Sequence, residues 1–213
     1  MQHRRRFSTA DVNNPAETLD QIVLATGNRG KLRDFALLFD RSGITLSLPS
    51  DHGIALEVEE TGATFEQNAL LKARAHAAVI DLPVLADDSG LAVEALGGRP
   101  GVISARYAGE PCDDHANNLK VLAEMAGVAD RRAAFVCVLA LVAPDGSEIV
   151  VRGQCEGHIA DEERGRNGFG YDAIFYRDDL GCTFGEASPA EKNARSHRAA
   201  AVRELLSRLG SVR

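Results

Sequence analysis

IVLATGNRGK, residues 22–31, joins an apolar run to a glycine-rich turn. The first four residues are continuously apolar, which is typical of a strand buried on both faces. Beyond the turn, apolar residues between 32 and 39 recur at helical spacing, and Ser42-Gly43 breaks the pattern. A strand, a glycine-rich turn and a helix in succession indicate an α/β fold with an anion-binding geometry, because backbone N–H groups and the helix N-terminus point outward together.

The turn itself has the residue types of a phosphate-binding loop, but its spacing is not the Walker pattern. In one interpretation, Thr26 and Asn28 hold a phosphate together with backbone amides, and Lys31 neutralises it as a point charge. In the other, the segment is an ordinary helix start with an exposed lysine. The turn taken alone does not choose between them.

Two adjacent carboxylates, Asp87 and Asp88, follow a second apolar run over residues 83–86. We expect Ser89-Gly90 to form a turn that ends this strand and leaves the carboxylates at a mouth of the fold. Crowded like charges cost free energy unless a cation, a donor or a shared proton compensates them. The pair therefore predicts a site for Mg²⁺ or for acid–base chemistry. The alternative is that Asp87 caps the turn while Asp88 is solvated.

Residues 54–60 alternate between apolar and acidic side chains and predict a further strand. In that strand Leu56, Val58 and Glu60 share one face. A carboxylate on a buried face needs a partner, so we expect one for Glu60.

The segment Thr64-Phe65-Glu66-Gln67 has a capping-box pattern and predicts a helix to about Val79. Asn68 and Lys72, four positions apart, lie on one face of it. Either both point at a ligand or Lys72 merely solvates its own face. A second helix is predicted over residues 113–126, with its Leu and Ala side chains on one side.

The late motifs combine glycine, aromatic and basic residues. Phe169 stands between two glycines, which suits stacking on a flat ring, although it would equally fill a core. Asp172 follows closely and is a candidate acceptor from a sugar hydroxyl or a base. Lys192 and Arg198 would point about 120° apart on one helix. Either the helix breaks near Ser196 or a ligand lies across its face.

Composition limits the class of protein. The 213 residues suit one sizeable domain or two small lobes around one sheet, and the net charge of −7 argues against a general nucleic-acid-binding surface. The four cysteines are far apart, so neither zinc ligation nor a disulfide framework is indicated. We expect a flexible extension over residues 1–20 and a single domain over residues 21–213. We also expect a cytoplasmic location, since neither a bilayer-spanning run nor a secretory signal is apparent.

With these motifs gathered, the chain resembles the inosine triphosphate pyrophosphatase family, the dITP/XTP pyrophosphatases. Five segments in this order carry the resemblance: ATGNRGK (25–31), EETGATFEQNALLKA (59–73), ADDSGLAVEALGGRPGVISARYAG (86–109), GFGYDAIF (168–175) and SPAEKNARSHRAAA (188–201). The chain departs from the family pattern at Ala173, where proline is usual, and at Gln67, where glutamate is frequent. Neither change removes a titratable group from the expected site.

The resemblance implies an elongated mixed β-sheet with flanking helices, arranged in two lobes with a central active-site cleft, in a homodimer. It also implies Glu60 and Asp88 as Mg²⁺ ligands, Asp88 as the general base, and Asp87 as an indirect support of the metal. The substrate contacts that it implies are the triphosphate loop Thr26, Gly27, Asn28, Arg29, Gly30 and Lys31, together with Lys72, Ser89, Phe169, Gly170, Tyr171, Asp172, Lys192, His197 and Arg198.

The activity implied is Mg²⁺-dependent hydrolysis of nonstandard purine nucleoside triphosphates (ITP, dITP and XTP) to the monophosphate and pyrophosphate. Such a reaction cleanses the nucleotide pool and involves neither a nucleic-acid polymer nor a membrane. One alternative is a related pyrophosphatase for other modified nucleotides. Others are a non-catalytic nucleotide-binding regulatory module and a purely structural α/β domain, which would leave Glu60 and the twin aspartates unexplained.

Overall fold

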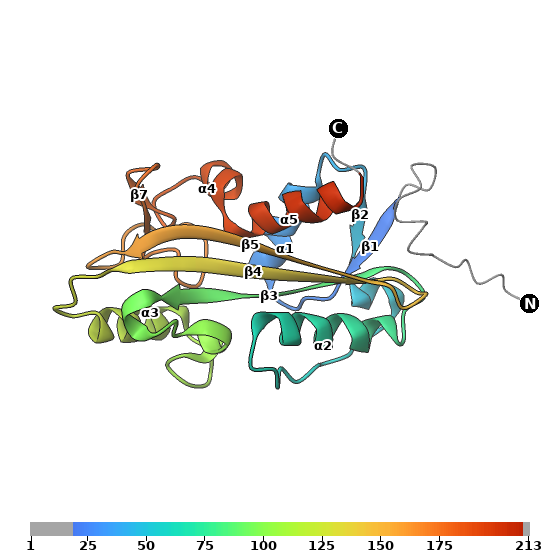
Figure 1. The fold of residues 1–213 in the computed structure, drawn as a ribbon, viewed down its shortest axis with the longest axis horizontal. Coiled ribbons are helices and arrows are strands. Elements are labelled where there is room, and N and C mark those ends of the chain that lie inside the picture. Colours follow the sequence, from blue (N-terminus) through green and yellow to red (C-terminus); the bar gives the residue numbers. More distant parts are fainter. Residues whose placement is uncertain (1–18, 211–213) are drawn as a thin grey trace, which may run out of the picture. The chain divides into compact units, whose positions relative to one another are not determined.

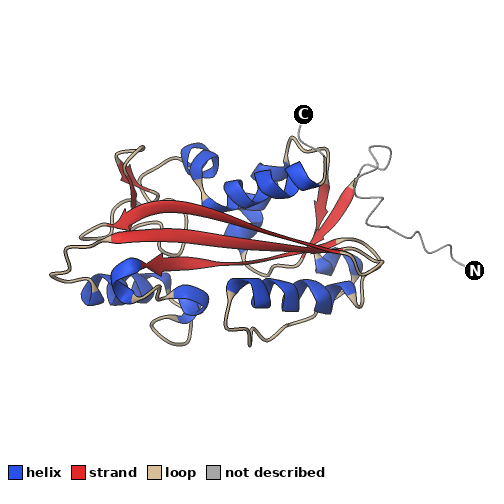
Figure 2. Ribbon diagram, viewed as in Figure 1, coloured by secondary structure: helices blue, strands red, loops and turns tan. Residues whose placement is uncertain are grey.

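A computed structural model describes residues 19–210. It contains helices, short 3₁₀ helices and strands that alternate along the chain (Figure 1, Figure 2). In chain order these elements are β1 Gln21–Leu24, α1 Arg29–Phe39, β2 Thr45–Ser47, η2 Pro49–His52, α2 Phe65–Ala77, β3 Val84–Val93, η3 Glu94–Leu96, η4 Gly101–Arg106, α3 Asp114–Glu124, β4 Arg132–Val142, β5 Glu148–Ile159, β6 Phe175–Arg177, β7 Cys182–Thr183, α4 Pro189–Arg195 and α5 His197–Arg208.

The strands form one seven-stranded sheet in the order β2-β1-β3-β4-β5-β6-β7. Strand β1 pairs in parallel with β2 and β3, whereas β6 pairs antiparallel with β5 and β7. The sheet is therefore mixed, and the predicted α/β class is confirmed. The cleft between two lobes stays a prediction.

The described chain divides into two compact units. Unit 1 contains residues 19–88, 138–152 and 201–210, and unit 2 contains Ser89–Cys137 and Gly153–Ala200. Strands β3, β4 and β5 contribute residues to both units. The assignment of residues 21–213 to a single domain stays a prediction.

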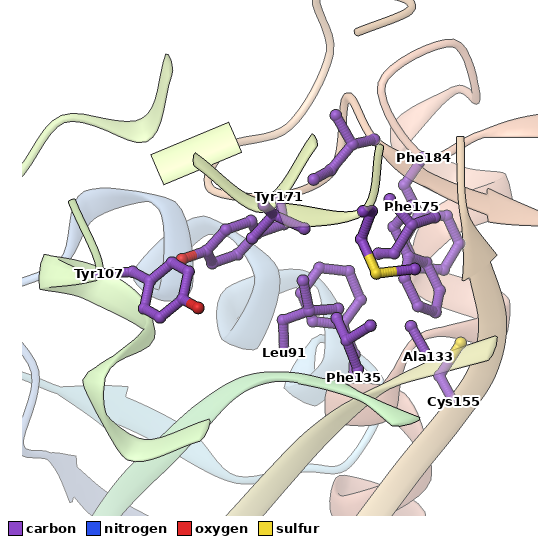
Figure 3. Packing of buried hydrophobic residues seen from close by; sticks show 13 residues of the cluster. Leu91, Tyr107, Ala133, Phe135, Cys155, Tyr171, Phe175 and Phe184 are labelled. Carbon is purple, nitrogen blue, oxygen red and sulfur yellow. The ribbon is translucent and has the colours of Figure 1, made fainter. Parts of the chain in front are cut away.

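Each unit has its own apolar core. One apolar cluster of unit 1 consists mainly of aliphatic side chains from β1, α2, β3 and β4, and Phe35 and Phe39 of α1 are buried in the same unit. Within this unit α1 and α2 lie on opposite faces of the sheet (Figure 2). The core of unit 2 is richer in aromatic rings, and Figure 3 shows Phe135, Phe175 and Phe184 packed together. The ring centroids of Phe135 and Phe175 are 4.4 Å apart.

The predicted turn at Ser89-Gly90 is wrong, because β3 continues through both residues to Val93. Leu91 and Val93 are fully buried, so the apolar pattern resumes after the two aspartates and the strand continues with it. Gly90 instead allows β3 and η4 to approach closely, because a Cβ at this position would lie 2.3 Å from Ser104 Oγ in η4.

The predicted strand over residues 54–60 is also wrong, since these residues belong to no helix or strand. Leu56 on its supposed buried face is 39% exposed. Alternation alone does not make a strand, because a strand needs a neighbour for its backbone hydrogen bonds, and β2 pairs with β1 instead.

The predicted helices are present. Thr64 caps α2, and Asp113 caps α3. Within α3, Leu119 is 50% exposed whereas Asn117 is only 2% exposed. Asn117 accepts a hydrogen bond from the backbone of Ala108 and donates one to the carbonyl of Ala105, which satisfies its buried amide.

The two interpretations of the basic C-terminal segment are resolved in favour of a break. Helix α4 ends at Arg195, and Ser196 has extended backbone angles (φ −73°, ψ 160°). Ser196 Oγ accepts a hydrogen bond from Ala199 N at 3.1 Å and so caps the start of α5. Lys192 therefore belongs to a different helix from His197 and Arg198.

Among the described residues, no helix has the length and apolar character needed to cross a membrane. Residues 1–18 of the predicted extension lie outside the described part of the chain. The carbonyl of Asp20 accepts a hydrogen bond from Thr45 N at 2.8 Å.

Candidate functional site

The turn after β1 places Lys31 against a carboxylate. Lys31 Nζ lies 2.9 Å from Asp87 Oδ2. Asn28 is the N-cap of α1, and its Oδ1 accepts hydrogen bonds from the backbone N–H groups of Gly30 and Lys31. These two amides are engaged by the cap, contrary to the interpretation in which they face outward to a ligand. Thr26 Oγ1 accepts from Asn28 N at 3.2 Å, and the neighbouring Arg29 is exposed.

Lys72 joins two carboxylates from separate segments of unit 1. Its Nζ lies 2.6 Å from Glu60 Oε1 and 3.5 Å from Asp88 Oδ1. The lysine projects from α2, Asp88 lies within β3, and Glu60 lies in the connection before α2. The interpretation in which Lys72 only solvates its helix is therefore wrong, and Glu60 and Asp88 converge on one cation.

The surroundings of this cluster shift the pKa values of two of its members. Burial acts to lower the pKa of Lys72, but the carboxylates of Asp87, Asp88 and Glu60 outweigh it and raise that pKa. Burial raises the pKa of Asp88, Lys72 opposes the rise, and Glu60 adds to it. Lys72 thus carries its positive charge firmly, while Asp88 is a stronger proton acceptor than an ordinary aspartate.

The twin aspartates form ion pairs with lysines of two different helices. Asp87 contacts Lys31 on α1, whereas Asp88 contacts Lys72 and Asn68 on α2. Successive residues of a strand point to opposite faces, which explains the separate contacts. Both carboxylates are buried, at 2% and 5% exposure, so neither the cap nor the solvated role considered for them applies.

In unit 2, the turn around Phe169 is held by a buried ion pair. Asp172 Oδ2 accepts from Lys192 Nζ at 2.6 Å and from Phe169 N at 2.8 Å. Gly168 has a φ of +77°, and a Cβ there would lie 2.0 Å from Asp172 Oδ2, which explains the first glycine of the motif. Burial raises the pKa of Asp172, and the Lys192 ammonium opposes that rise.

Two cations flank the half-buried Phe169 ring. Lys192 Nζ lies 4.7 Å and Arg198 Cζ lies 5.0 Å from its centroid. Phe169 does not belong to the apolar core of unit 2, so the core-filling interpretation does not hold. Arg198 Nη2 also donates to Ser89 Oγ at 3.1 Å, and the buried His197 ring stacks on Phe135 at 4.7 Å.

Comparison with known proteins places this arrangement in a family. The model of the Ham1 family matches residues 22–208. The chain belongs to the Ham1 family. It is 50% identical over 193 residues to a dITP/XTP pyrophosphatase of Bacillus cereus, covering 89% of this chain and 94% of that protein. It is 48% identical over 205 residues to a dITP/XTP pyrophosphatase of Burkholderia pseudomallei, covering 94% of this chain and 98% of that one.

Solved structures agree with this membership of the Ham1 family. The Ham1 protein of Staphylococcus aureus has a TM-score of 0.81 and 45% identity to this chain, with coverage of 89% of this chain and 98% of that one. A HAM1 protein from Coxiella burnetii gives a TM-score of 0.82 and 43% identity, with coverage of 90% and 99%. The resemblance drawn from the five motifs is confirmed.

The site of this Ham1 family member includes residues that the motifs did not single out. Asp114 Oδ2, at the start of α3, accepts a hydrogen bond from Gly170 N at 2.6 Å. This contact holds the turn around Phe169 in addition to the one that Asp172 makes with Phe169 N. Tyr171 OH donates to Ser104 O at 2.7 Å, so Tyr171 anchors the turn to η4. In sequence these residues are an ordinary helix start and a loop serine. Their contacts join positions 56 and 67 residues apart, which no local pattern reveals.

The carboxylate cluster fits a magnesium ion. In the part of the chain that the structure describes, no group of three or more Asp, Glu, His or Cys side chains would enclose a metal by itself. Magnesium is ordinarily held by one or two carboxylates, with water and substrate phosphates completing its octahedron. Glu60 and Asp88 already direct oxygen atoms at one cation, the Lys72 ammonium, and the Glu60 side chain is 28% exposed.

Proposed function

We propose that the chain hydrolyses nonstandard purine nucleoside triphosphates, such as dITP, ITP and XTP, to the monophosphate and pyrophosphate. The observation that carries the proposal is the convergence of Glu60 and Asp88 on Lys72. A site for triphosphate hydrolysis needs oxygen ligands for a divalent ion beside fixed positive charge. The names of the family relatives, dITP/XTP pyrophosphatase, support the same substrates.

In this proposal Glu60 and Asp88 hold Mg²⁺. When bound, the ion would neutralise negative charge on the phosphate oxygens. Asp88 takes the proton from the water that attacks the α-phosphorus. Lys31 and Lys72 stabilise the departing pyrophosphate as point charges.

The base end of the nucleotide is assigned to the Phe169 cluster of unit 2. Phe169 stacks on the purine, while Lys192, His197 and Arg198 supply donors that are each at most 5% exposed. Hypoxanthine and xanthine present an acceptor at position 6, whereas adenine presents an amino donor. Adenine would leave buried donors facing a donor, a mismatch that costs more than a steric difference of one methylene.

The proposal also includes dependence on Mg²⁺, a homodimeric assembly and a cytoplasmic location. In the cell the reaction would remove nonstandard nucleotides from the nucleotide pool. The acidic chain, with 31 Asp and Glu against 24 Lys and Arg, supports a small nucleotide rather than a nucleic-acid polymer as ligand.

The proposal is tested by measuring pyrophosphate release from dITP, XTP, dGTP and dATP, with Mg²⁺ and with EDTA. We expect release from dITP and XTP only with Mg²⁺, and kcat/KM at least about 100-fold lower for dATP, as a polar mismatch in a buried site predicts. Comparable kcat/KM for dATP and dITP would defeat the base assignment. Release of orthophosphate in place of pyrophosphate would defeat attack at the α-phosphorus.

A further inference from the structure

We propose that Asn68 is a positioning residue that fixes Glu60 and Asp88 relative to each other before the metal binds. The inference rests on the proposed function, because it assigns to Asn68 the geometry of the two proposed Mg²⁺ ligands. Asn68 touches neither the substrate nor the reacting atoms in this proposal and acts through Asp88 and the backbone next to Glu60.

The side chain of Asn68 is buried and bonded at both ends. The residue is 1% exposed, on the α2 turn that lies one turn before Lys72. Its Nδ2 donates to Asp88 Oδ2 at 3.2 Å, and its Oδ1 accepts from Gly62 N at 2.7 Å. One amide therefore connects β3 to the segment that carries Glu60.

The backbone partner determines which way the amide faces. The N–H of Gly62 is only a donor, so the carbonyl oxygen of Asn68 must face it and the NH₂ group must face Asp88. The NH₂ group then donates a hydrogen bond to Oδ2 of Asp88, and Oδ1 of the same carboxylate is directed at Lys72. Asn68 thus selects the carboxylate oxygen that faces the cation.

The Glu60 segment is held outside the sheet. Residues 54–60 form no strand, so no ladder of backbone hydrogen bonds fixes Glu60. The segment is instead docked on the first turn of α2, where Gly62 N bonds Asn68 and Ala63 N donates to Gln67 Oε1 at 2.7 Å. The docking needs a glycine, because a Cβ on Gly62 would lie 2.6 Å from Asn68 Oδ1.

Such positioning has a measurable value for a magnesium site. Mg²⁺ demands a nearly ideal octahedron with short bonds, so loosely held carboxylates bind it poorly. Loss of a residue that orients a metal ligand typically lowers metal affinity or activity by about 10- to 100-fold. We expect a loss of that size when Asn68 is replaced.

The matched control is Asn117, which also lies on a helix, is 2% exposed and bonds two backbone groups through its amide. Asn68→Leu and Asn117→Leu each remove one such two-ended amide. Thermal unfolding of both variants shows whether they lose comparable stability. Asn117→Leu is then expected to bind Mn²⁺ as the wild-type protein does.

The first measurement is Mn²⁺ binding to the full chain without nucleotide, followed by electron paramagnetic resonance. We expect about tenfold or weaker Mn²⁺ affinity for Asn68→Leu. Equal Mn²⁺ affinity for Asn68→Leu and wild type would overturn the proposal. So would an equal loss for Asn117→Leu, since general destabilisation would then explain both.

The second measurement is hydrogen exchange of the backbone amides at residues 61–63. Asn68→Leu should accelerate this exchange, and Gly62→Ala should do so as well, because its Cβ would push the segment away from Asn68. Asn68→Asp keeps an acceptor for Gly62 and should preserve slow exchange, yet it faces Asp88 with an acceptor and should lower kcat. Unchanged exchange in Asn68→Leu would contradict the proposed bridge.

These readouts separate the inference from the proposed function. If the wild-type protein releases no pyrophosphate from any nucleotide, the proposed function fails. Mn²⁺ affinity and amide exchange would still decide whether Asn68 fixes the two carboxylates.

Discussion

The two units carry charge clusters that differ in how far they are closed to solvent. In unit 1 the side chains of Lys72 and Glu60 are 13% and 28% exposed. In unit 2 the side chains of Lys192 and Asp172 are 5% and 4% exposed. In the first cluster Lys72 and Glu60 are partly accessible although the Asp88 side chain is only 6% exposed, whereas the second is a closed lysine–aspartate pair.

This difference indicates different roles for charge. Carboxylates that stay partly accessible can exchange a lysine ammonium for a metal ion and phosphate. A closed pair is expensive to open, because a buried charge left without its partner costs several kcal/mol. We therefore interpret the unit 1 cluster as the place of the proposed chemistry and the Lys192–Asp172 pair of unit 2 as a rigid support for the Phe169 ring.

The largest expected effect is on turnover. Asp88→Asn removes the proposed base and one metal ligand, and we expect kcat to fall by about 10²- to 10⁴-fold. Asp87→Asn is the matched neighbour, since Asp87 forms its ion pair with Lys31 on α1. Steady-state pyrophosphate release from dITP gives kcat for both variants. A larger loss for Asp87→Asn would move the base to that residue.

The next effect is on stability in unit 2. Asp172→Asn leaves the buried Lys192 without its carboxylate partner, and we expect the free energy of unfolding to fall by about 3–5 kcal/mol. Glu204→Gln is the control, because its pair with Arg208 is about half exposed and should contribute less than about 1 kcal/mol. Urea denaturation compares them. Equal losses would remove the distinction between a closed and an open cluster.

A smaller effect, on KM, should distinguish the residues that bind the base from those that bind the phosphates. Phe169→Leu removes an aromatic ring, and we expect the KM for dITP to rise about tenfold, the lower end of the range for stacking on a base. Inhibition by inorganic tripolyphosphate, which has no base, should stay unchanged in Phe169→Leu and weaken in Lys72→Met. Weaker tripolyphosphate inhibition in Phe169→Leu would contradict the division of roles.

The smallest effect is a change in alkaline stability specific to unit 2, which holds all three tyrosines of a chain without tryptophan. Burial and the contact with Glu124 raise the pKa of Tyr107 to about 12. The unfolded chain loses this proton first, from about pH 10. The stability contributed by Tyr107 is therefore complete below pH 10 and is lost as the pH rises toward 12.

Tyr107→Phe tests this sign. The free energy of unfolding should fall less steeply with pH in the variant between pH 10 and 12, with tyrosinate absorbance recording the titration. Equal slopes for the variant and the wild type would show that Tyr107 titrates alike in the folded and unfolded states.

Local sequence patterns predicted several elements because their causes are local. The cap at Thr64 is formed with the N–H of Gln67, three positions further on, and it is present. The helix break at Ser196 was one of two alternatives that the sequence left open. The strand prediction for residues 54–60 was wrong because a strand needs a neighbouring strand from elsewhere in the chain, and local alternation does not show whether one is available.

The sequence by itself determined the α/β class, the family and most of the residues that form the two clusters. Identity and order of residues carry that information, since capping, apolar periodicity and motif spacing act over a few positions. Only the tertiary structure decided that Lys72 joins Glu60 to Asp88, that Asp87 pairs with Lys31, and that Asn68 and Asp114 support the clusters. Those contacts join residues brought together by strand pairing and core packing, and no short-range pattern encodes which distant side chains meet.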